Sequence, residues 1–404
     1  MYYPKLKKFL IAQAVRLNEA DGGDKVSTLP NVRPEVDEYG QPTGRGPFAA
    51  VYENMIGHLL KNPTLQFERE RIENSLTEET VSTQIATFTT FALPLVRRVM
   101  RNLVCINSGL VSVQPMRTPT ADIFYAKRKY TSTYAPDGIT AGDDVADIPG
   151  AYQYAQSSEK GTIREMDLEI VSKTVSAISM KLQSSFTEET IQNLAAYHNL
   201  SFEGEIKSLF ADEIQCETDR YILQAMLAGA AYNINWANLA PAGDVTTADK
   251  KAYFETLYST AMMAASMRIL TYMHIPAGWA IMSPTVLQYL MRCETFRMSA
   301  DINNLQTSVG IQQIGSIGGT IKVLVDPAFP VNKILMGCNA IDWTRAAAVY
   351  SPFLPLFFSD RFVMANDFSQ QRMGCMSRFY AGVITKNETE AHSDGLSTVT
   401  ITSS

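Results

Sequence analysis

Few residues in this chain have the types and spacing that metal binding or nucleophilic catalysis requires. The four histidines are dispersed, and the five cysteines include no Cys-x-x-Cys pair. Structural zinc sites need Cys and His ligands at short, regular spacings, and an odd number of cysteines argues against a disulfide framework. We therefore expect no metal site, and we expect the cysteines to be reduced packing residues.

Two pairs of neighbouring carboxylates could in principle serve as general acid and base. They are Asp143 with Asp144, in a polar, glycine-containing segment, and Glu188 with Glu189, at a predicted helix start. Acid–base catalysis at neutral pH needs a carboxyl whose pKa is raised, usually by burial. Neither position favours burial, so we interpret both pairs as solvated charges.

The sequence also lacks the glycine-rich motifs of phosphate and acyl chemistry. The patterns GxxxxGK[ST], GxGxxG and GxSxG are all absent, and GSIGGT at 315–320 precedes a strand instead of joining a strand to a helix. That context predicts a turn. We predict that the protein is not an enzyme and uses no cofactor. An enzyme site in the segment 278–319 stays open as an alternative, which a pocket with converging titratable groups would support.

A basic cluster raises the question of nucleic-acid binding. Lys127, Arg128 and Lys129 lie between Tyr125 and Tyr130. Proteins that bind single strands combine a positive groove with aromatic rings on which bases stack. The formal net charge of −6, however, gives no overall basic face for nucleic acid.

The elements that position this cluster are two predicted strands. Residues 123–130 alternate between two faces, and residues 164–181 form a second strand candidate that carries Glu165, Asp167 and Glu169. Opposite charges on facing positions stabilise antiparallel strand pairs. We therefore favour a hairpin in which the acids face the basic cluster over a nucleic-acid surface.

The stretch LVSVQPMRTPTADIFY, residues 110–125, leads into the first of these strands. Pro115 and Pro119 fix φ and remove backbone donors, so residues 114–120 should form a rigid, extended corner that continues neither a helix nor a central strand. The polar loop at 131–162 is much longer than usual hairpin loops, which indicates that it has a function of its own.

Two helices are predicted next, at 187–199 and at 202–230. Ser185 and Glu188 fit a capping box at the first. The heptamer SFTEETI there resembles SLTEETV at 75–81, which we interpret as a second helix start, with an internal duplication as the alternative. The longer helix is expected to pack through an apolar stripe and to expose its acids. The stripe consists of Ile206, Leu209, Phe210 and Ile214, and the acids are Glu203, Glu205, Asp212, Glu217 and Asp219.

The remainder predicts a mixed helix and strand section with a polar end. We expect a joint rich in Gly, Pro and Asn at 233–243, helices at 249–271 and 285–291, strands at 278–283, 320–326, 346–358 and 373–384, and a polar tail at 387–404.

The N-terminal part predicts segments that reach outward. Residues 1–20 imitate a secretory signal, but the short apolar run, broken by Gln13, favours an amphipathic helical arm. An extended connector at 21–48 and a helical section at 49–100 follow. Only 19% of the residues are charged, below the usual quarter, which indicates a surface that is partly covered by other chains. No apolar run reaches the ~20 residues of a membrane span.

Five segments, in this order, resemble the major capsid proteins of T-even-like tailed bacteriophages, which have the Hong Kong 97 fold. The most specific is ALPLVRRVMRNLVCINSGLVSVQPMRTPTADIFYAKRKY, residues 92–130, whose QPM and PT phrases and following IF match the family pattern. The others are the helical region 184–223, GWAIMSPTVLQYL at 278–290, GGTIKVLVDPAFPVNKILMGCN at 318–339, and AAAVYSPFLPLF with MGCMSRFY at 346–357 and 373–380.

The resemblance implies an α+β fold with an N-terminal arm, an extension loop, a peripheral domain around a long spine helix, and an axial domain. In these terms the chain divides into arm and helical lead-in (1–109), extension loop (110–182), spine helices (183–235), axial domain (236–345), return strands of the peripheral domain (346–386) and C-terminal tail (387–404). Compared with T-even relatives, the middle loop lacks a large insertion. Leu17-Asn18-Glu19 would fit a maturation cleavage motif.

The implied function is structural: self-assembly into hexamers and pentamers of an icosahedral shell that encloses double-stranded DNA without sequence-specific binding. Scaffold, portal and decoration proteins are the implied partners, and the implied location is the virion, after assembly in the host cytoplasm. An encapsulin-type nanocompartment, which stores an enzyme cargo in a shell of the same fold, is the alternative. The residues expected to matter for assembly are Pro115, Pro119, Lys127, Arg128, Lys129, Glu165, Asp167 and Glu169.

Overall fold

The computed structural model describes most of the chain from residue 103 onward. The described residues are 33, 51, 54–55, 103–133, 140–142, 165–198, 202–237, 247–298, 311–340, 346–359, 361–364, 367–385 and 392–402. The predicted arm and connector, nearly all of the helical section 49–100, the acids Asp143 and Asp144, and most of the loop 131–162 therefore lie outside the described residues.

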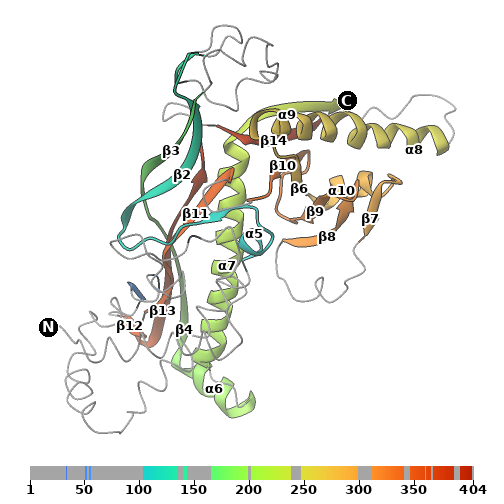
Figure 1. Cartoon of the computed structure of the whole chain (residues 1–404). Coiled ribbons are helices and arrows are strands. Elements are labelled where there is room, and N and C mark those ends of the chain that lie inside the picture. Colours follow the sequence, from blue (N-terminus) through green and yellow to red (C-terminus); the bar gives the residue numbers. More distant parts are fainter. Residues whose placement is uncertain are drawn as a thin grey trace, which may run out of the picture.

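The described elements combine helices with three sheets, which confirms the predicted α+β class (Figure 1). The helices are α5 (Val104–Asn107), α6 (Glu188–His198), α7 (Phe202–Ala228), α8 (Thr247–Thr256), the π-helix η5 (Leu257–Met262), α9 (Met263–Met273) and α10 (Pro284–Leu290). The strands are β1 (Ser112–Val113), β2 (Thr120–Tyr130), β3 (Met166–Ser176), β4 (Ile178–Thr187), β5 (Ala230–Ala237), β6 (Ala277–Met282), β7 (Phe296–Met298), β8 (Gln312–Ile317), β9 (Ile321–Val325), β10 (Lys333–Cys338), β11 (Ala348–Phe358), β12 (Phe362–Met364), β13 (Asp367–Val383) and β14 (Ser393–Thr402).

The largest sheet has seven strands in the order β5-β14-β10-β6-β9-β8-β7. Its central strand β6 is buried along its whole length, as expected of a strand that is paired on both edges and covered on both faces. The predicted strands at 278–283 and 320–326 and the predicted helix at 285–291 correspond to β6, β9 and α10. Ser283 begins α10 by accepting a hydrogen bond from the Val286 backbone N–H at 3.4 Å.

The expected polar tail is wrong in its larger part. Residues 393–402 form β14, which pairs parallel with β5 and antiparallel with β10. Leu396, Val399 and Ile401 are buried, and the serines and threonines between them made the segment look like a solvated end. Thr and Val favour strands, and the Thr398 hydroxyl donates to the Tyr232 carbonyl at 3.2 Å, so the polar residues are accommodated inside the sheet.

The joint predicted at 233–243 is also partly wrong, because residues 230–237 form strand β5. Asn233 and Asn235 suggested a turn, but their amides join side chains across and along the strands. The Asn233 Oδ1 accepts from the Thr400 hydroxyl at 2.7 Å, and the Asn233 Nδ2 donates to the Asn235 Oδ1 at 3.1 Å. Residues 238–243 lie outside the described part of the chain.

The second sheet has the order β1-β11-β13-β12, with β4 also paired to β13. The strands predicted at 346–358 and 373–384 correspond to β11 and β13. The strand predicted at 164–181 is split at Ala177, so that β3 and β4 belong to different sheets. The Ala177 N–H donates to the Pro119 carbonyl at 2.8 Å. At this residue the chain passes from the hairpin into the second sheet.

The N-cap residue predicted for the first of these helices, Ser185, is wrong. Ser185 lies within β4, opposite Arg372, so it caps nothing. The Thr187 hydroxyl instead accepts from the Thr190 backbone N–H at 3.4 Å, directly before α6 begins at Glu188. A threonine is also an effective N-cap residue, and the run SSFTEET offered more than one candidate.

The long helix α7 runs beside the second sheet, as Figure 1 shows, and two expectations about its faces are wrong. Leu209 is 66% exposed although it was placed on the packing stripe. Asp219 is only 4% exposed although it was placed on the outer surface. A helix that meets neighbours on several sides along 27 residues does not keep one straight apolar stripe.

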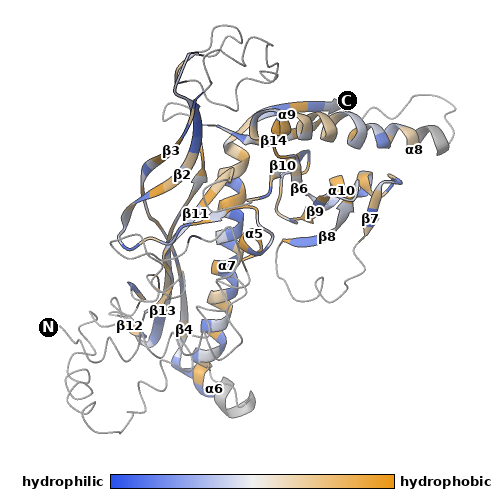
Figure 2. Ribbon diagram, in the orientation of Figure 1, coloured by the Kyte–Doolittle hydropathy of each residue, from blue (hydrophilic) through white to orange (hydrophobic). Residues whose placement is uncertain are grey.

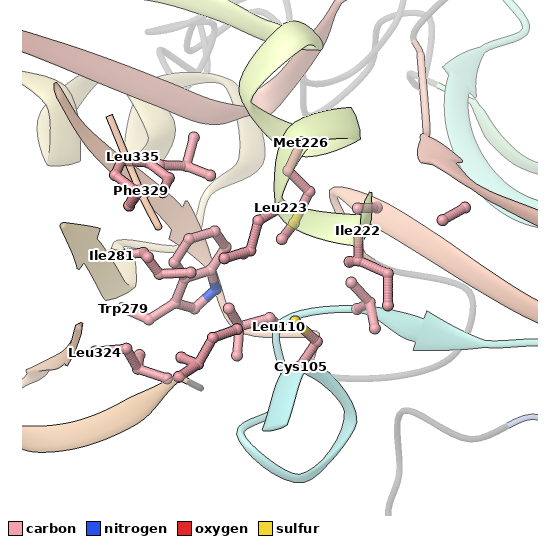
Figure 3. Packing of buried hydrophobic residues seen from close by; sticks show 14 of the residues in the cluster. Cys105, Leu110, Ile222, Leu223, Met226, Trp279, Ile281, Leu324, Phe329 and Leu335 are labelled. Atoms are coloured by element: carbon pink, nitrogen blue, oxygen red, sulfur yellow. The ribbon is translucent and has the colours of Figure 1, made fainter. Parts of the chain in front are cut away.

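The hydrophobic core is continuous from α7 to the seven-stranded sheet. Figure 3 shows Leu223 and Met226 of α7 near Trp279 of β6, with Cys105 and Leu110 of the α5 segment on the adjoining side. All five of these residues are buried, and none of them is more than 2% exposed. The α5 segment therefore lies where helix α7 meets both sheets.

The helix predicted at 249–271 is present as α8, η5 and α9 in succession. It ends at His274, the one described non-glycine residue with positive φ, 57°, whose N–H donates to the Leu270 carbonyl. Such left-handed residues commonly close helices. None of the described helices is long and apolar enough to cross a membrane.

Candidate assembly ribbon

Strands β2 and β3 form a separate two-stranded ribbon, and its pairing confirms the predicted antiparallel hairpin. The register sets Lys127 opposite Glu169 and Lys129 opposite Asp167. Arg128 does not face an acid, because it lies opposite Leu168. Glu165 precedes the first residue of β3 and is not in the register of paired residues, although its backbone carbonyl accepts from the Thr131 N–H at 3.0 Å.

One face of the outer half of the ribbon is charged and largely self-neutralised. The Lys129 Nζ lies 2.6 Å from the Glu169 Oε2, a diagonal contact on the face that also carries Lys127 and Asp167. The hydrogen bond from Lys129 lowers the pKa of Glu169. Lys127 lies over the Tyr125 ring at 5.6 Å from its centre. These basic side chains therefore already have partners within the ribbon.

The other face of the same half is apolar on β3. Met166, Leu168 and Ile170 are 61%, 55% and 62% exposed, and their register partners are Tyr130, Arg128 and Ala126. In Figure 2 hydrophilic and hydrophobic colours both occur along β2 and β3, in keeping with a ribbon that has one charged and one apolar face. Since side chains alternate between faces, these three residues form one continuous patch, which we call the ribbon patch.

The root of the ribbon is fixed by the buried amide of Gln114. Its Nε2 donates to the Phe124 carbonyl at 2.7 Å, and its Oε1 accepts from the Phe124 N–H at 2.9 Å. The Gln114 backbone N–H donates to the Tyr350 carbonyl at 3.0 Å. One residue thus joins β2 to β11, and Ile123 and Val175 close the root by packing into the core.

The first proline of the corner, Pro115, occupies a position that needs no backbone donor. On either side of Pro115, the N–H groups of Gln114 and Met116 donate to the carbonyls of Tyr350 and Pro352. Proline therefore interrupts no hydrogen bond of this edge. Residues 114–119 belong to no helix or strand, as predicted, although Thr120 is already the first residue of β2.

The other described candidate groups, Glu188, the GSIGGT segment and Cys293, lie apart in structural positions. Glu188 accepts from the Gln371 side-chain amide at 2.6 Å, which ties α6 to β13. Residues 318–320 of GSIGGT form the predicted turn, whereas 315–317 belong to β8. Burial raises the pKa of the Cys293 thiol to about 11, the opposite of what a nucleophilic thiol needs.

The cysteines pack in the interior, and the potential metal ligands are dispersed among the described residues. All five cysteines are buried, as predicted, and none of them is in a disulfide. No group of three or more metal-binding side chains gathers among the described residues.

Two polar residues with structural roles escaped the reasoning from sequence. Gln114 stands between Val113 and Pro115 in an otherwise apolar run, and a lone polar residue in such a run was the available signal. Asp219 accepts from the backbone N–H groups of Val104 and Cys105. Nothing local distinguishes it from the exposed acids of the same helix.

Comparison of the sequence with known families decides what these elements belong to. A sequence model of the family described as major capsid protein Gp23 matches residues 85–160 and 139–403. The chain belongs to the Gp23 major capsid protein family. As a major capsid protein it has a structural role, acts in many copies in a shell, and is part of the virion.

Solved structures similar to this capsid protein include phage capsids. The capsid of Myoviridae phage XM1 is 10% identical, with 74% of this chain and 92% of that chain covered and a TM-score of 0.44. The capsid of cyanophage P-SCSP1u is 11% identical, with 74% and 88% covered and a TM-score of 0.43. A virus-like particle from Pyrococcus furiosus is 8% identical, with 76% and 97% covered and a TM-score of 0.41. The family assignment rests on the sequence match and not on these scores. No curated protein matches the sequence.

Proposed function

We propose that this major capsid protein self-assembles into the hexamers and pentamers of an icosahedral shell around double-stranded DNA, and that the ribbon patch docks on a neighbouring copy. The observation that carries the docking proposal is the exposure of Met166, Leu168 and Ile170 beside a charged face whose groups are paired internally. A two-stranded ribbon is marginally stable alone, and an exposed apolar patch of this kind marks a contact surface.

The proposed domains follow from the same reading. Residues 110–182 would be the extension loop, with the ribbon as its described part, and 183–235 with 346–386 would form the peripheral domain around α7. Residues 236–345 would be the axial domain. Strands β5 and β14 belong to the seven-stranded sheet, so we assign residues 230–235 and 393–402 to the proposed axial domain instead of to the peripheral domain and the tail.

In this proposal the eight predicted assembly residues have distinct tasks. Pro115 and Pro119 would stiffen the root of the ribbon, while the ion-paired face would keep the ribbon soluble and correctly registered. Lys127, Lys129, Asp167 and Glu169 are the members of that face. Arg128 shares a face with the ribbon patch and would contact the neighbouring copy directly, and Glu165 would act at the loop beyond the ribbon.

Other partners and the reaction class are inferred from the same capsid role. Scaffold, portal and possible decoration proteins would act with the shell in the host cytoplasm, and the subunit would catalyse no reaction. The net charge of −6 suits a container that must release its DNA. Packaging and release that are unaffected when several acids are changed to lysine would contradict this part. A nanocompartment is less favoured, since the matching family is that of a phage capsid protein.

The test of the docking proposal replaces the ribbon patch with Met166→Thr, Leu168→Thr and Ile170→Thr together. Threonine retains a high strand propensity, so the isolated subunit should keep its circular dichroism and its urea midpoint. Shell formation, measured by electron microscopy and sedimentation after expression with the other phage head proteins, should be lost.

The matched control changes the opposite face of the same ribbon, with Lys127→Gln, Asp167→Asn and Glu169→Gln. This variant removes charges without touching the patch, and it should lower the yield of shells by a much smaller factor than the patch variant does. Normal shells from the patch variant, or equal losses in both variants, would contradict docking through the patch.

A further inference from the structure

The described residues of the N-terminal region contact the root of the ribbon at two places. One place is Arg33, and the other is formed by the helical residues Val51, Asn54 and Met55. Val51 and Met55 belong to the hydrophobic core and are 1% and 2% exposed. Helix positions three and four apart lie on one face, so Asn54 lies on the same inward side as these two anchors. The core therefore holds the Asn54 backbone in place.

The side-chain amide of Asn54 joins the proline corner to strand β11. Its Nδ2 donates to the Met116 carbonyl at 2.9 Å and to the Phe353 carbonyl at 3.2 Å. The register of β11 and β13 shifts between Pro352 and Leu354, which makes Phe353 the extra residue of a β-bulge. Met116 and Phe353 are both buried, and carbonyls in such positions need donors. One amide thus holds the corner against the bulge of β11.

Arg33 contacts the chain before and after the corner. Its backbone N–H donates to the carbonyl of Val113 at 2.8 Å, the last residue of the edge strand β1. Its guanidinium lies over the Phe124 ring, 4.6 Å from the centre, and such a contact is stronger when the cation is partly desolvated. Arg33 is half-buried. Because Phe124 belongs to β2, this one residue joins the edge of the second sheet to the ribbon.

The direction of the ribbon depends on how the corner is held. Residues 114–119 belong to no helix or strand, and β2 begins directly after them. Pro115 and Pro119 fix φ at two positions but leave ψ free. The N–H groups of Gln114 and Met116 attach the corner to β11, while Asn54 and Arg33 attach it from the N-terminal side. Removing the N-terminal contacts would leave the corner with its contacts to β11 alone on that stretch.

We propose that Arg33 and Asn54 form an N-terminal strap that fixes the direction of the ribbon relative to the second sheet. Both are positioning residues, which act through the corner and through Phe124. A displacement of the N-terminal segment would then release the ribbon, so the two parts of the chain move together. The strap acts within one subunit and does not depend on the proposed shell contacts.

Amide hydrogen exchange of the full-length subunit tests the hold on the corner. Asn54→Ala should accelerate exchange of the Gln114, Met116 and Phe124 N–H groups by about fivefold for each hydrogen bond lost. Asn54→Asp keeps the shape of the side chain, but an ionised carboxylate donates no hydrogen bond, so exchange should accelerate at least as much. Exchange in Asn54→Asp that matches the unmodified protein would assign this residue to packing alone and overturn the strap.

The matched control is Asn233→Ala in the seven-stranded sheet. It also removes a side-chain amide, whose oxygen accepts from Thr400 and whose nitrogen donates to Asn235. After correction for the change in the urea midpoint, this variant should leave exchange at the corner unchanged. Equal acceleration at the corner in Asn233→Ala and Asn54→Ala would mean that exchange follows the stability of the whole subunit, and would overturn the proposal.

Pulsed electron paramagnetic resonance tests the direction of the ribbon. Spin labels on Thr131→Cys, at the outer end of the ribbon, and on Gln288→Cys, in α10, occupy exposed positions, whereas the native cysteines are buried. Arg33→Ala and Asn54→Ala should each widen the distribution of label distances, and Arg33→Lys, which retains a cation, should widen it less than Arg33→Ala.

The Arg33 variants keep the test decisive if the Asn54 variants do not fold, because the Arg33 side chain is only half-buried. A distance distribution in Arg33→Ala that is as narrow as that of the unmodified protein would overturn the role of Arg33. Faster exchange at the corner without a wider distribution in any variant would overturn the control of ribbon direction by the strap.

Discussion

The seven-stranded sheet and the β2–β3 ribbon treat apolar side chains in opposite ways. Every residue of β6 is buried, whereas the outer half of β3 exposes Met166, Leu168 and Ile170. Burial stabilises a fold by about 25 cal/mol for each Å² of apolar surface removed from water, so the sheet stabilises the subunit and the ribbon forgoes that gain. The difference indicates which region serves the subunit alone and which serves its contacts. Substitutions in the sheet should change folding, and those in the ribbon should change assembly.

The largest effect is expected from a chain that ends at Ala391, which lacks β14. This strand lies between β5 and β10, so its removal leaves two unpaired edges in the middle of the sheet. We expect the loss to exceed the ~5–15 kcal/mol by which proteins are usually stable, and cooperative unfolding in urea should disappear. A chain that ends at Thr402 retains β14 and is the control. A normal unfolding transition in the shorter chain would show that β14 is dispensable.

The next effect is expected from Trp279→Ala in β6. Trp279 is fully buried, its Nε1 donates to the Cys338 carbonyl at 2.9 Å, and its ring fills the space over Gly337, where an added Cβ would lie 2.3 Å from it. Removing such a side chain should lower the free energy of unfolding by about 3–5 kcal/mol, measured by urea denaturation. Trp279→Phe keeps part of the packing and should lose less. Equal losses would place the effect in the hydrogen bond alone.

The double variant Pro115→Gly, Pro119→Gly tests the ribbon root, where the two regions meet. Glycine adds backbone freedom to the unfolded state, which costs about 0.4–1 kcal/mol per site, so the isolated subunit should be only slightly less stable. We expect the yield of shells seen by electron microscopy to fall by a larger factor than the fraction of folded subunit. Unfolding of the isolated subunit, with no separate defect in assembly, would contradict the role of the corner.

The comparison also shows which features a sequence reveals. The ribbon was predicted, with its acids facing the basic cluster, because strand periodicity and opposite charges are local signals. The register then sets Lys127 opposite Glu169 and Lys129 opposite Asp167, but Arg128 opposite Leu168. The strand character of 393–402 was missed, since Ser and Thr are typical of both solvated ends and paired strands, and only the neighbouring strands decide. The burial of Asp219 was missed for a related reason: its partners, Val104 and Cys105, are remote in sequence.

The smallest effect is expected from the ion pair on the charged face of the ribbon. Lys129 and Glu169 are both well exposed, 38% and 47% at the side chain, and water and salt screen such pairs strongly. Lys129→Gln should therefore leave the unfolding midpoint in urea almost unchanged, and it should raise the pKa of Glu169 toward its ordinary value, because the hydrogen bond from Lys129 is what lowers it. Nuclear magnetic resonance titration of the Glu169 carboxyl measures that change, and Lys173→Gln, on the same face nearer the root, is the matched control.

A large loss of subunit stability in Lys129→Gln would mean that the charged face holds the ribbon together. The assignment of subunit stability to the sheet and of assembly contacts to the ribbon would then be wrong, since the ribbon would also stabilise the subunit.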